Sequence, residues 1–302
     1  MIDWLLLVLP GCIWGASFLF IAEGLEAMAP MGVTFVRIVI GFLTLSLVPA
    51  ARRPIAAADR RWTALLGVLW LAFPLSMFPF AEQHVSSALT GMLNGATALS
   101  AAAVATLLAR RLPSRAMLTG LAIGFTGAVL IAWPGVATST PTDNHALGIL
   151  LIALALTSYG FAYNLAGPLQ QRNGALPVVW RALGTAVVLT APLGIPAVIG
   201  AHWTLWPLLS MLMLGVFGTG IANVLAATAA GRLGATTSSA TAFLIPVVAL
   251  VLGVVLRHEH VAPLSIVGAA ICLGGAWLVR QARMAEVPAE APLVQHSGSV
   301  RI

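Results

Sequence analysis

Residues 4–22 read WLLLVLPGCIWGASFLFIA, and this stretch decides the fold class. It contains no charged side chain, and a second run, Val247-Val248-Ala249-Leu250-Val251-Leu252, is equally apolar. A strand of a membrane β-barrel alternates apolar and polar side chains, and neither run alternates. A helix crosses a bilayer core of about 30 Å with roughly 20 apolar residues. Both runs therefore predict membrane-spanning helices.

The composition of the whole chain agrees with these two runs. Of its 302 residues 60% are hydrophobic and 8% are charged, whereas a soluble domain carries about 25% charged residues. The mean hydropathy is +0.99. We therefore expect an all-α membrane protein and no soluble catalytic domain. The sequence predicts ten spans, at 4–22, 30–49, 62–81, 86–109, 116–133, 146–167, 176–199, 204–229, 236–256 and 263–280.

The basic residues predict how the chain lies in the membrane. All 15 are arginines, and basic residues favour the cytoplasmic loops. With the N-terminus inside, twelve arginines lie on the cytoplasmic side and only Arg257 lies between spans on the opposite side. We therefore expect a multi-pass protein of the cell inner (plasma) membrane with both termini cytoplasmic. The twelve are Arg52, Arg53, Arg60, Arg61, Arg110, Arg111, Arg115, Arg172, Arg232, Arg280, Arg283 and Arg301.

The two halves of the chain match each other weakly at an offset of 148 residues. Leu66-Gly67-Val68 then falls on Leu214-Gly215-Val216, and Gly120 and Gly127 fall on Gly268 and Gly275. Each half contains five spans, an odd number, so the second half is inverted relative to the first. Inverted repeats are typical of secondary transporters. We expect a first five-helix repeat at 1–135, a second at 136–280 and a flexible cytoplasmic tail at 281–302.

Three stretches resemble a known family. They are Ile13-Trp14-Gly15-Ala16-Ser17-Phe18, the run TSSATAFLIPV at 237–247, and Arg257-His258-Glu259-His260 followed by a glycine-rich segment at 268–275. They are similar to the drug/metabolite transporter superfamily and its EamA-type members. The resemblance implies ten helices in two inverted repeats and export of amino acids or other metabolites. In the first half Ala98 replaces Pro246 and Arg111 replaces Glu259, so a role shared by both halves is not expected there.

A substrate cavity is expected near mid-membrane, where Pro74 and Pro79 interrupt the third span and glycines interrupt the eighth. Asn94 lies on one face of its span with Thr90 and Thr97, at helical spacing. Aromatic rings near mid-span suit an apolar side chain of the substrate, and amides and hydroxyls suit its polar ends. The residues expected to bind substrate are Trp14, Ser17, Phe78, Asn94, Tyr159, Tyr163, Asn164, Ser238 and Thr241.

Charged side chains inside a membrane often mark function, and two arginines lie within spans. Arg37 and Arg181 could form a gate or a carboxylate clamp, or their side chains could reach the interface. Glu82 and His84 form a possible proton site at the outer mouth. We expect no cofactor and no metal site, because adjacent residues such as those of Arg257-His258-Glu259-His260 point apart on a helix.

The sequence therefore predicts a secondary transporter that exports small metabolites, most simply aromatic or apolar amino acids, by alternating access between the two repeats. No glycine-rich nucleotide loop or hydrolase motif is present, so we do not expect an enzyme. The expected partners are a small-molecule substrate and the lipid bilayer, without nucleic acid, and the protein is expected to act as a monomer, with a dimer as an alternative. A lipid or lipid-carrier flippase of the same fold is the alternative function.

Overall fold

The structure is a computed structural model that describes residues 2–110, 114–137, 144–226, 228, 241 and 244–286. Within these residues the regular structure is helical, with no strand. Eight helices are long and apolar enough to cross a membrane, and two shorter apolar helices accompany them. Each of the ten predicted windows overlaps one of these helices. The prediction of an all-α membrane protein is confirmed, while the count of ten crossings stays a prediction.

Several predicted spans consist of more than one helical segment. The segments, in chain order, are α1 (Ile2–Leu25), α2 (Pro30–Ser46), η1 (Pro49–Arg52), η2 (Ala57–Asp59), α3 (Arg60–Leu66), η3 (Gly67–Ala72), α4 (Phe73–Ala81), α5 (Ser87–Asn94), α6 (Thr97–Ala109), α7 (Arg115–Ala137), α8 (His145–Asn173), α9 (Ala175–Ile199), α10 (Leu205–Met213), η4 (Leu214–Ile221), α12 (Leu244–Leu256) and α13 (Pro263–Glu286). The last helix continues past 280, where the tail was expected to begin, and residues 287–302 lie outside the described part of the chain.

The third and eighth spans each contain a π-helical segment, η3 and η4, at positions that the 148-residue offset superposes. In the third span the widened turn begins before Pro74 rather than at it. A proline clashes with the carbonyl four residues earlier, which for Pro74 belongs to Trp70 inside η3. In the eighth span no proline is involved, and the segment contains three glycines, Gly215, Gly218 and Gly220. Such π segments are common at functional sites.

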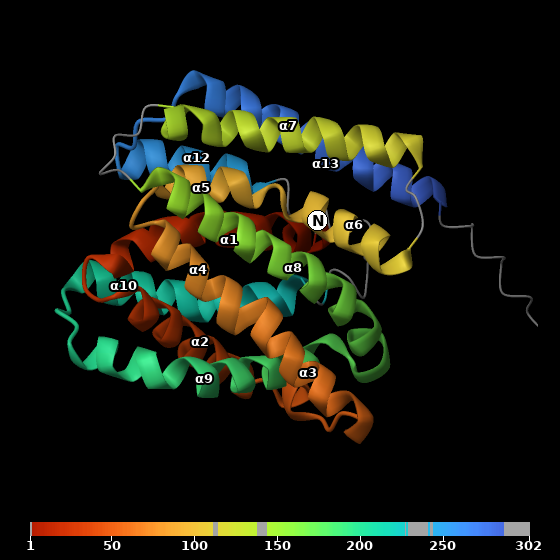
Figure 1. Ribbon diagram of the computed structural model, residues 1–302. Helices are drawn as coiled ribbons and strands as arrows, with labels where there is room; N and C mark the ends of the chain where they lie inside the picture. Colours follow the sequence, from red (N-terminus) through yellow and green to blue (C-terminus); the bar gives the residue numbers. More distant parts are fainter. Residues whose placement is uncertain are drawn as a thin grey trace, which may run out of the picture.

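The helices pack in reciprocal pairs (Figure 1). Helix α1 packs on α12 as α8 packs on α6, and α2 packs on η4 as α9 packs on η3. Two further pairs, α7 with α13 and α2 with α9, lie at opposite sides of the bundle. The 148-residue offset turns α1 into α8, α2 into α9 and α7 into α13. Two equivalent halves would produce this pattern of contacts.

The pair of α7 and α13 explains the glycines that revealed the repeat. A Cβ atom at Gly120 would lie 2.8 Å from the backbone nitrogen of Val279, and one at Gly268 would lie 2.7 Å from that of Ile131. At Gly127 and Gly275 the added atom would overlap backbone atoms of the opposite helix. Small residues allow such close approach of helices in a membrane. The four glycines therefore hold the ends of the two halves together.

One end of the bundle, here called the Arg257 end, carries a cluster of charged side chains. Arg257 donates to Glu23, in the last turn of α1, and at 3.2 Å to Glu26, directly after α1. Its Nε lies 3.9 Å from Glu259. Burial lowers the pKa of Arg257, but the negative charges of Glu23 and Glu26 more than offset this effect and raise that pKa. Glu259 accepts hydrogen bonds from the backbone nitrogens of Ser87 at 3.0 Å and Ala88 at 2.8 Å. It therefore caps α5.

The other end, here called the Asp59 end, carries a second cluster. Arg172 at the end of α8 donates to Asp59 at 2.8 Å, and Asn173 donates to the same carboxylate at 2.7 Å. The carbonyl of the Asn173 side chain accepts from the backbone nitrogen of Ala56 at 2.9 Å. Polar contacts thus join residues far apart in the sequence at both ends of the bundle.

Candidate functional site

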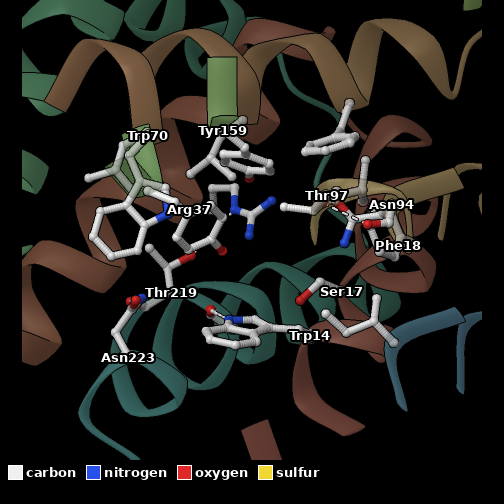
Figure 2. A pocket seen from close by; sticks show the side chains of 17 residues that line it. Trp14, Ser17, Phe18, Arg37, Trp70, Asn94, Thr97, Tyr159, Thr219 and Asn223 are labelled. Carbon is white, nitrogen blue, oxygen red and sulfur yellow. Dashed lines mark hydrogen bonds between the residues drawn. The ribbon is translucent and has the colours of Figure 1, made fainter. Parts of the chain in front are cut away.

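A cavity of about 130 Å³ lies in the middle of the bundle. This volume exceeds the roughly 10–15 Å³ that one water molecule needs, so the cavity has room for a small solute group. Its lining comes from both halves of the chain, including both π segments (Figure 2). The lining residues are Trp14, Ser17, Phe18, Ile21, Arg37, Trp70, Leu71, Leu75, Phe78, Asn94, Thr97, Tyr159, Tyr163, Gly218, Thr219, Asn223 and Ile245.

Aromatic rings follow one another along the cavity. Phe18 meets Phe78 edge to face at 5.6 Å between ring centroids, and Phe78 lies 6.0 Å from Tyr159. The series continues from Tyr159 to Tyr163 at 6.1 Å and from Tyr163 to Trp70 at 5.9 Å. Each of these pairs lies within the range in which aromatic rings attract one another. The five rings form a continuous apolar wall from α1, α4, α8 and η3.

Trp14 covers the opposite side of the cavity and connects α1 to the π segment η4. Its indole nitrogen donates to the carbonyl oxygen of Gly218 at 3.0 Å. The hydroxyl of Ser17, one turn further along α1, donates to its own helix at Ile13. A Cβ atom at Gly218 would lie 2.9 Å from the Ser17 hydroxyl. The glycine is therefore needed where α1 and η4 approach each other closely.

Arg37 projects from α2 into the cavity, between Tyr159 and Trp14 (Figure 2). Only 5% of the residue is exposed. Its Nε donates to the hydroxyl of Thr219 at 3.3 Å, and that hydroxyl donates to the carbonyl of Leu214. Among the described residues, the guanidinium makes no hydrogen bond other than the one to Thr219, so its two terminal nitrogens remain available. A guanidinium with two free nitrogens suits a carboxylate, which it can bind in a bidentate manner.

Asn94 lies where the fourth span is broken. Helix α5 ends at Asn94 and α6 begins at Thr97. The hydroxyl of Thr97 donates to the backbone carbonyl of Asn94 at 2.6 Å and lies 3.2 Å from its side-chain oxygen. A Cβ atom at Gly95 would lie 2.8 Å from the ring of Pro246 on α12, so the break sits against the ninth span. Interrupted helices of this kind form substrate sites in transporters.

The structure brings together most of the residues singled out in the sequence. Six of the nine expected substrate-binding residues line the cavity, together with Arg37: Trp14, Ser17, Phe78, Asn94, Tyr159 and Tyr163. Thr241 is buried but is not among the lining residues, and Ser238 lies outside the described residues. The expectation did not include Thr219 and Asn223, which the π segment η4 and the turn after it bring to the cavity.

Two expected residues have other contacts. Asn164 donates to the carbonyl of Ala101 on α6 at 2.9 Å and to that of Gly160 at 2.8 Å, so it joins α8 to α6 instead of lining the cavity. Arg181 donates to Pro177 on its own helix at 3.1 Å, and its guanidinium lies 5.3 Å from the centre of the Trp180 ring. A clamp at Arg181 on this cavity is therefore not supported. The pair Glu82 and His84 lies outside the cavity, after α4.

Apolar helices around a central, partly polar cavity are the architecture of a membrane transporter. The chain belongs to the EamA-like transporter family, whose model matches residues 2–133 and 146–281. The "Probable terminal-alkyne amino-acid exporter" of Streptantibioticus cattleyicolor is 28% identical over 281 residues, which are 91% of this chain and 92% of that protein. A solved crystal structure shares the fold, with a TM-score of 0.65 and 18% identity over 95% of this chain and 98% of that chain.

Proposed function

We propose that this transporter exports amino acids with an aromatic or apolar side chain. The observation that carries the proposal is the position of Arg37, a buried cation with two available nitrogens in a cavity walled by aromatic rings. Its charge calls for an anionic group of the substrate, because a buried charge without a partner is unfavourable. The curated relative named as an amino-acid exporter supports the same class.

The cavity suggests how such a substrate would lie. Its carboxylate would bind the terminal nitrogens of Arg37, and its side chain would pack on the rings of Phe78 and Tyr159. Among the described lining residues Arg37 is the charged one, so the amino group would meet neutral acceptors, such as the side-chain oxygens of Asn94 and Asn223. A zwitterion fits this arrangement better than a cation does.

We further propose alternating access around the cavity, with residues 1–135 and 136–280 as its two equivalent repeats. The Arg257 cluster supports this, since it connects α1 and α5 of the first half to the segment after α12 in the second. Opening the cavity at that end requires these ion pairs to separate. The arginines Arg52, Arg53, Arg60 and Arg61 lie near the Asp59 end, which we assign to the cytoplasm of an inner-membrane protein by the positive-inside rule.

The proposal is tested by counterflow in liposomes that contain the purified protein. Liposomes preloaded with L-phenylalanine should accumulate labelled L-phenylalanine from outside. Phe78→Ala should impair counterflow of L-phenylalanine more than that of L-alanine, because it removes part of the aromatic wall. Phe125→Ala is the matched control, since Phe125 on α7 is 51% exposed. Absence of counterflow for aromatic, branched and small amino acids would overturn the proposal, and lipid scrambling in the same liposomes would favour a flippase.

A further inference from the structure

The carboxyl group of Glu82, directly after α4, differs from its acidic neighbours. Both of its oxygens are buried, and neither has a hydrogen-bond partner in the described structure. The other acids that the structure describes at the Arg257 end have partners: Glu23 and Glu26 pair with Arg257, and Glu259 caps α5. A buried carboxylate without partners is costly, and protonation removes its charge. Glu82 is therefore a carboxyl group poised to bind a proton.

The charges around Glu82 determine when it can ionise. Burial raises its pKa well above the ordinary value, the negative charge of Glu259 raises it further, and the positive charges of Arg257 and Arg37 lower it. Arg257 already pairs with three glutamates, whereas the partner of Arg37 among the described residues is a neutral hydroxyl. The titratable and charged groups on the elements around Glu82 include Glu23 on α1, Glu26 directly after it, Arg37 on α2, His145, Tyr159, Tyr163 and Arg172 on α8, His84 after α4, and Arg257, His258, Glu259 and His260 after α12.

Arg37 connects this carboxyl group to the cavity. Helix α2, which carries Arg37, packs on α4, and the hydroxyl of Thr34 donates across this contact to the carbonyl of Leu75 at 3.2 Å. Without a bound carboxylate, the positive charge of Arg37 favours the ionised form of Glu82, although no ion pair joins the two side chains in the described structure. A substrate carboxylate bound to Arg37 would neutralise that charge, so Arg37 would no longer stabilise the ionised form of Glu82. Binding of the substrate and binding of a proton would then favour each other, because such coupling is reciprocal.

We propose that Glu82 takes up a proton from water when a carboxylate occupies Arg37 and releases it when the carboxylate leaves. Proton and substrate then bind together, and the charge of the bound carboxylate is balanced without an ionised glutamate nearby. This inference rests on the proposed binding of amino acids at Arg37. It adds a proton site outside the cavity and fixes the sign of the coupling.

Because proton and substrate favour each other's binding, the Kd for the substrate should depend on pH in a distinctive way. At low pH Glu82 is protonated in both states, so binding takes up no proton and the affinity is constant. As the pH rises above the pKa of Glu82 in the empty protein, each bound substrate must bring one proton. The Kd for the substrate should then increase by up to about tenfold per pH unit. Glu82→Gln imitates the protonated form and should bind tightly with no such dependence.

The experiment is titration calorimetry of L-phenylalanine in buffers of different ionisation enthalpy, which counts the protons taken up per bound substrate. Proton uptake is expected in the unaltered protein and in the control His84→Gln, and it is expected to be lost in Glu82→Gln. A Glu82→Gln protein that takes up the same number of protons would overturn the proposal. So would L-phenylalanine binding without proton uptake across the whole pH range.

The two proposals fail in different ways. If L-phenylalanine and the other amino acids do not bind at all, the proposed function fails, and the coupling to it fails as well. If they bind without protons, only the coupling fails. Should Glu82→Gln not fold, infrared difference spectra of the unaltered protein decide the matter. Addition of L-phenylalanine must increase the absorbance of protonated carboxyl groups, and an unchanged carboxyl band would overturn the proposal.

Discussion

Replacing Arg37 by Gln should weaken substrate binding without lowering the stability of the fold. The guanidinium uses its Nε for Thr219 and leaves two nitrogens for the substrate. Hydrogen bonds that involve a charged group contribute about 1.5–3 kcal/mol each, so losing two, each at the lower limit, removes about 3 kcal/mol. That corresponds to a roughly hundredfold increase in Kd. Arg37→Lys keeps the charge without the planar pair of donors, and we expect about a tenfold increase.

The stability of the same variant should not fall. Arg37 is a buried cation whose hydrogen-bond partner among the described residues is a hydroxyl, and removing such a charge is neutral or stabilising when the replacement fits. Thermal unfolding should therefore show an unchanged or higher midpoint for Arg37→Gln. A residue that reduces binding while the fold is unharmed acts on the substrate directly.

Arg181→Gln provides the matched control for this experiment. Arg181 also lies within a span, but it contacts its own helix and Trp180 instead of the cavity. Its replacement should leave the Kd for L-phenylalanine unchanged, as measured by titration calorimetry in detergent. Wild-type affinity in a well-folded Arg37→Gln protein would refute the reasoning. So would an equal loss of affinity in both variants.

Three further predictions concern stability. The pKa of Glu82 is raised in the folded protein, so protonated Glu82 stabilises the fold fully below the ordinary glutamate pKa. This stabilisation is lost as the pH rises through the raised value. The melting midpoint of the unaltered protein should therefore fall with rising pH more than that of Glu82→Gln. Glu259→Gln weakens the cap of α5 and should cost about 1 kcal/mol, whereas Glu26→Gln, at a side chain that is 58% exposed, should change the midpoint less; an equal effect would contradict the capping role. Gly275→Ala places a methyl group against the backbone of α7 and should lower the free energy of unfolding by about 1–3 kcal/mol. Gly274→Ala, with open space around it, should be neutral or slightly stabilising. The yield and melting midpoint of the purified proteins distinguish the two variants.

The spans could be predicted because the bilayer sets a local requirement on length and polarity. The same requirement gives no information about breaks inside a span. The turn between Asn94 and Thr97 occurs in a stretch that reads as one continuous helix, and it lies where Gly95 closely approaches Pro246 of a distant span. Likewise, Pro74 indicated an irregular third span, but the widened turn lies before it, in η3.

The site could be predicted only in part, because the neighbours of a helix face are not encoded in that helix alone. Asn94 and Asn164 are both amides within apolar spans, yet one lines the cavity and the other donates to α6. Arg37 and Arg181 differ in the same way. What favoured Trp14, Tyr159 and Tyr163 was their aromatic character near mid-span, and the structure places all three on the cavity.

The contact between Glu259 and α5 has a consequence for biosynthesis. Ser87 and Glu259 are 172 residues apart, and a chain emerges from the ribosome N-terminus first. The fourth span must therefore enter the bilayer before Glu259 can accept hydrogen bonds from the backbone nitrogens of Ser87 and Ala88. Only when nearly the whole polypeptide has been synthesised can Glu259 reach them. A nascent chain that stalls after Leu256 would carry Asn94 and Arg37 in the membrane, but its fourth span would lack the acceptor that caps its first turn.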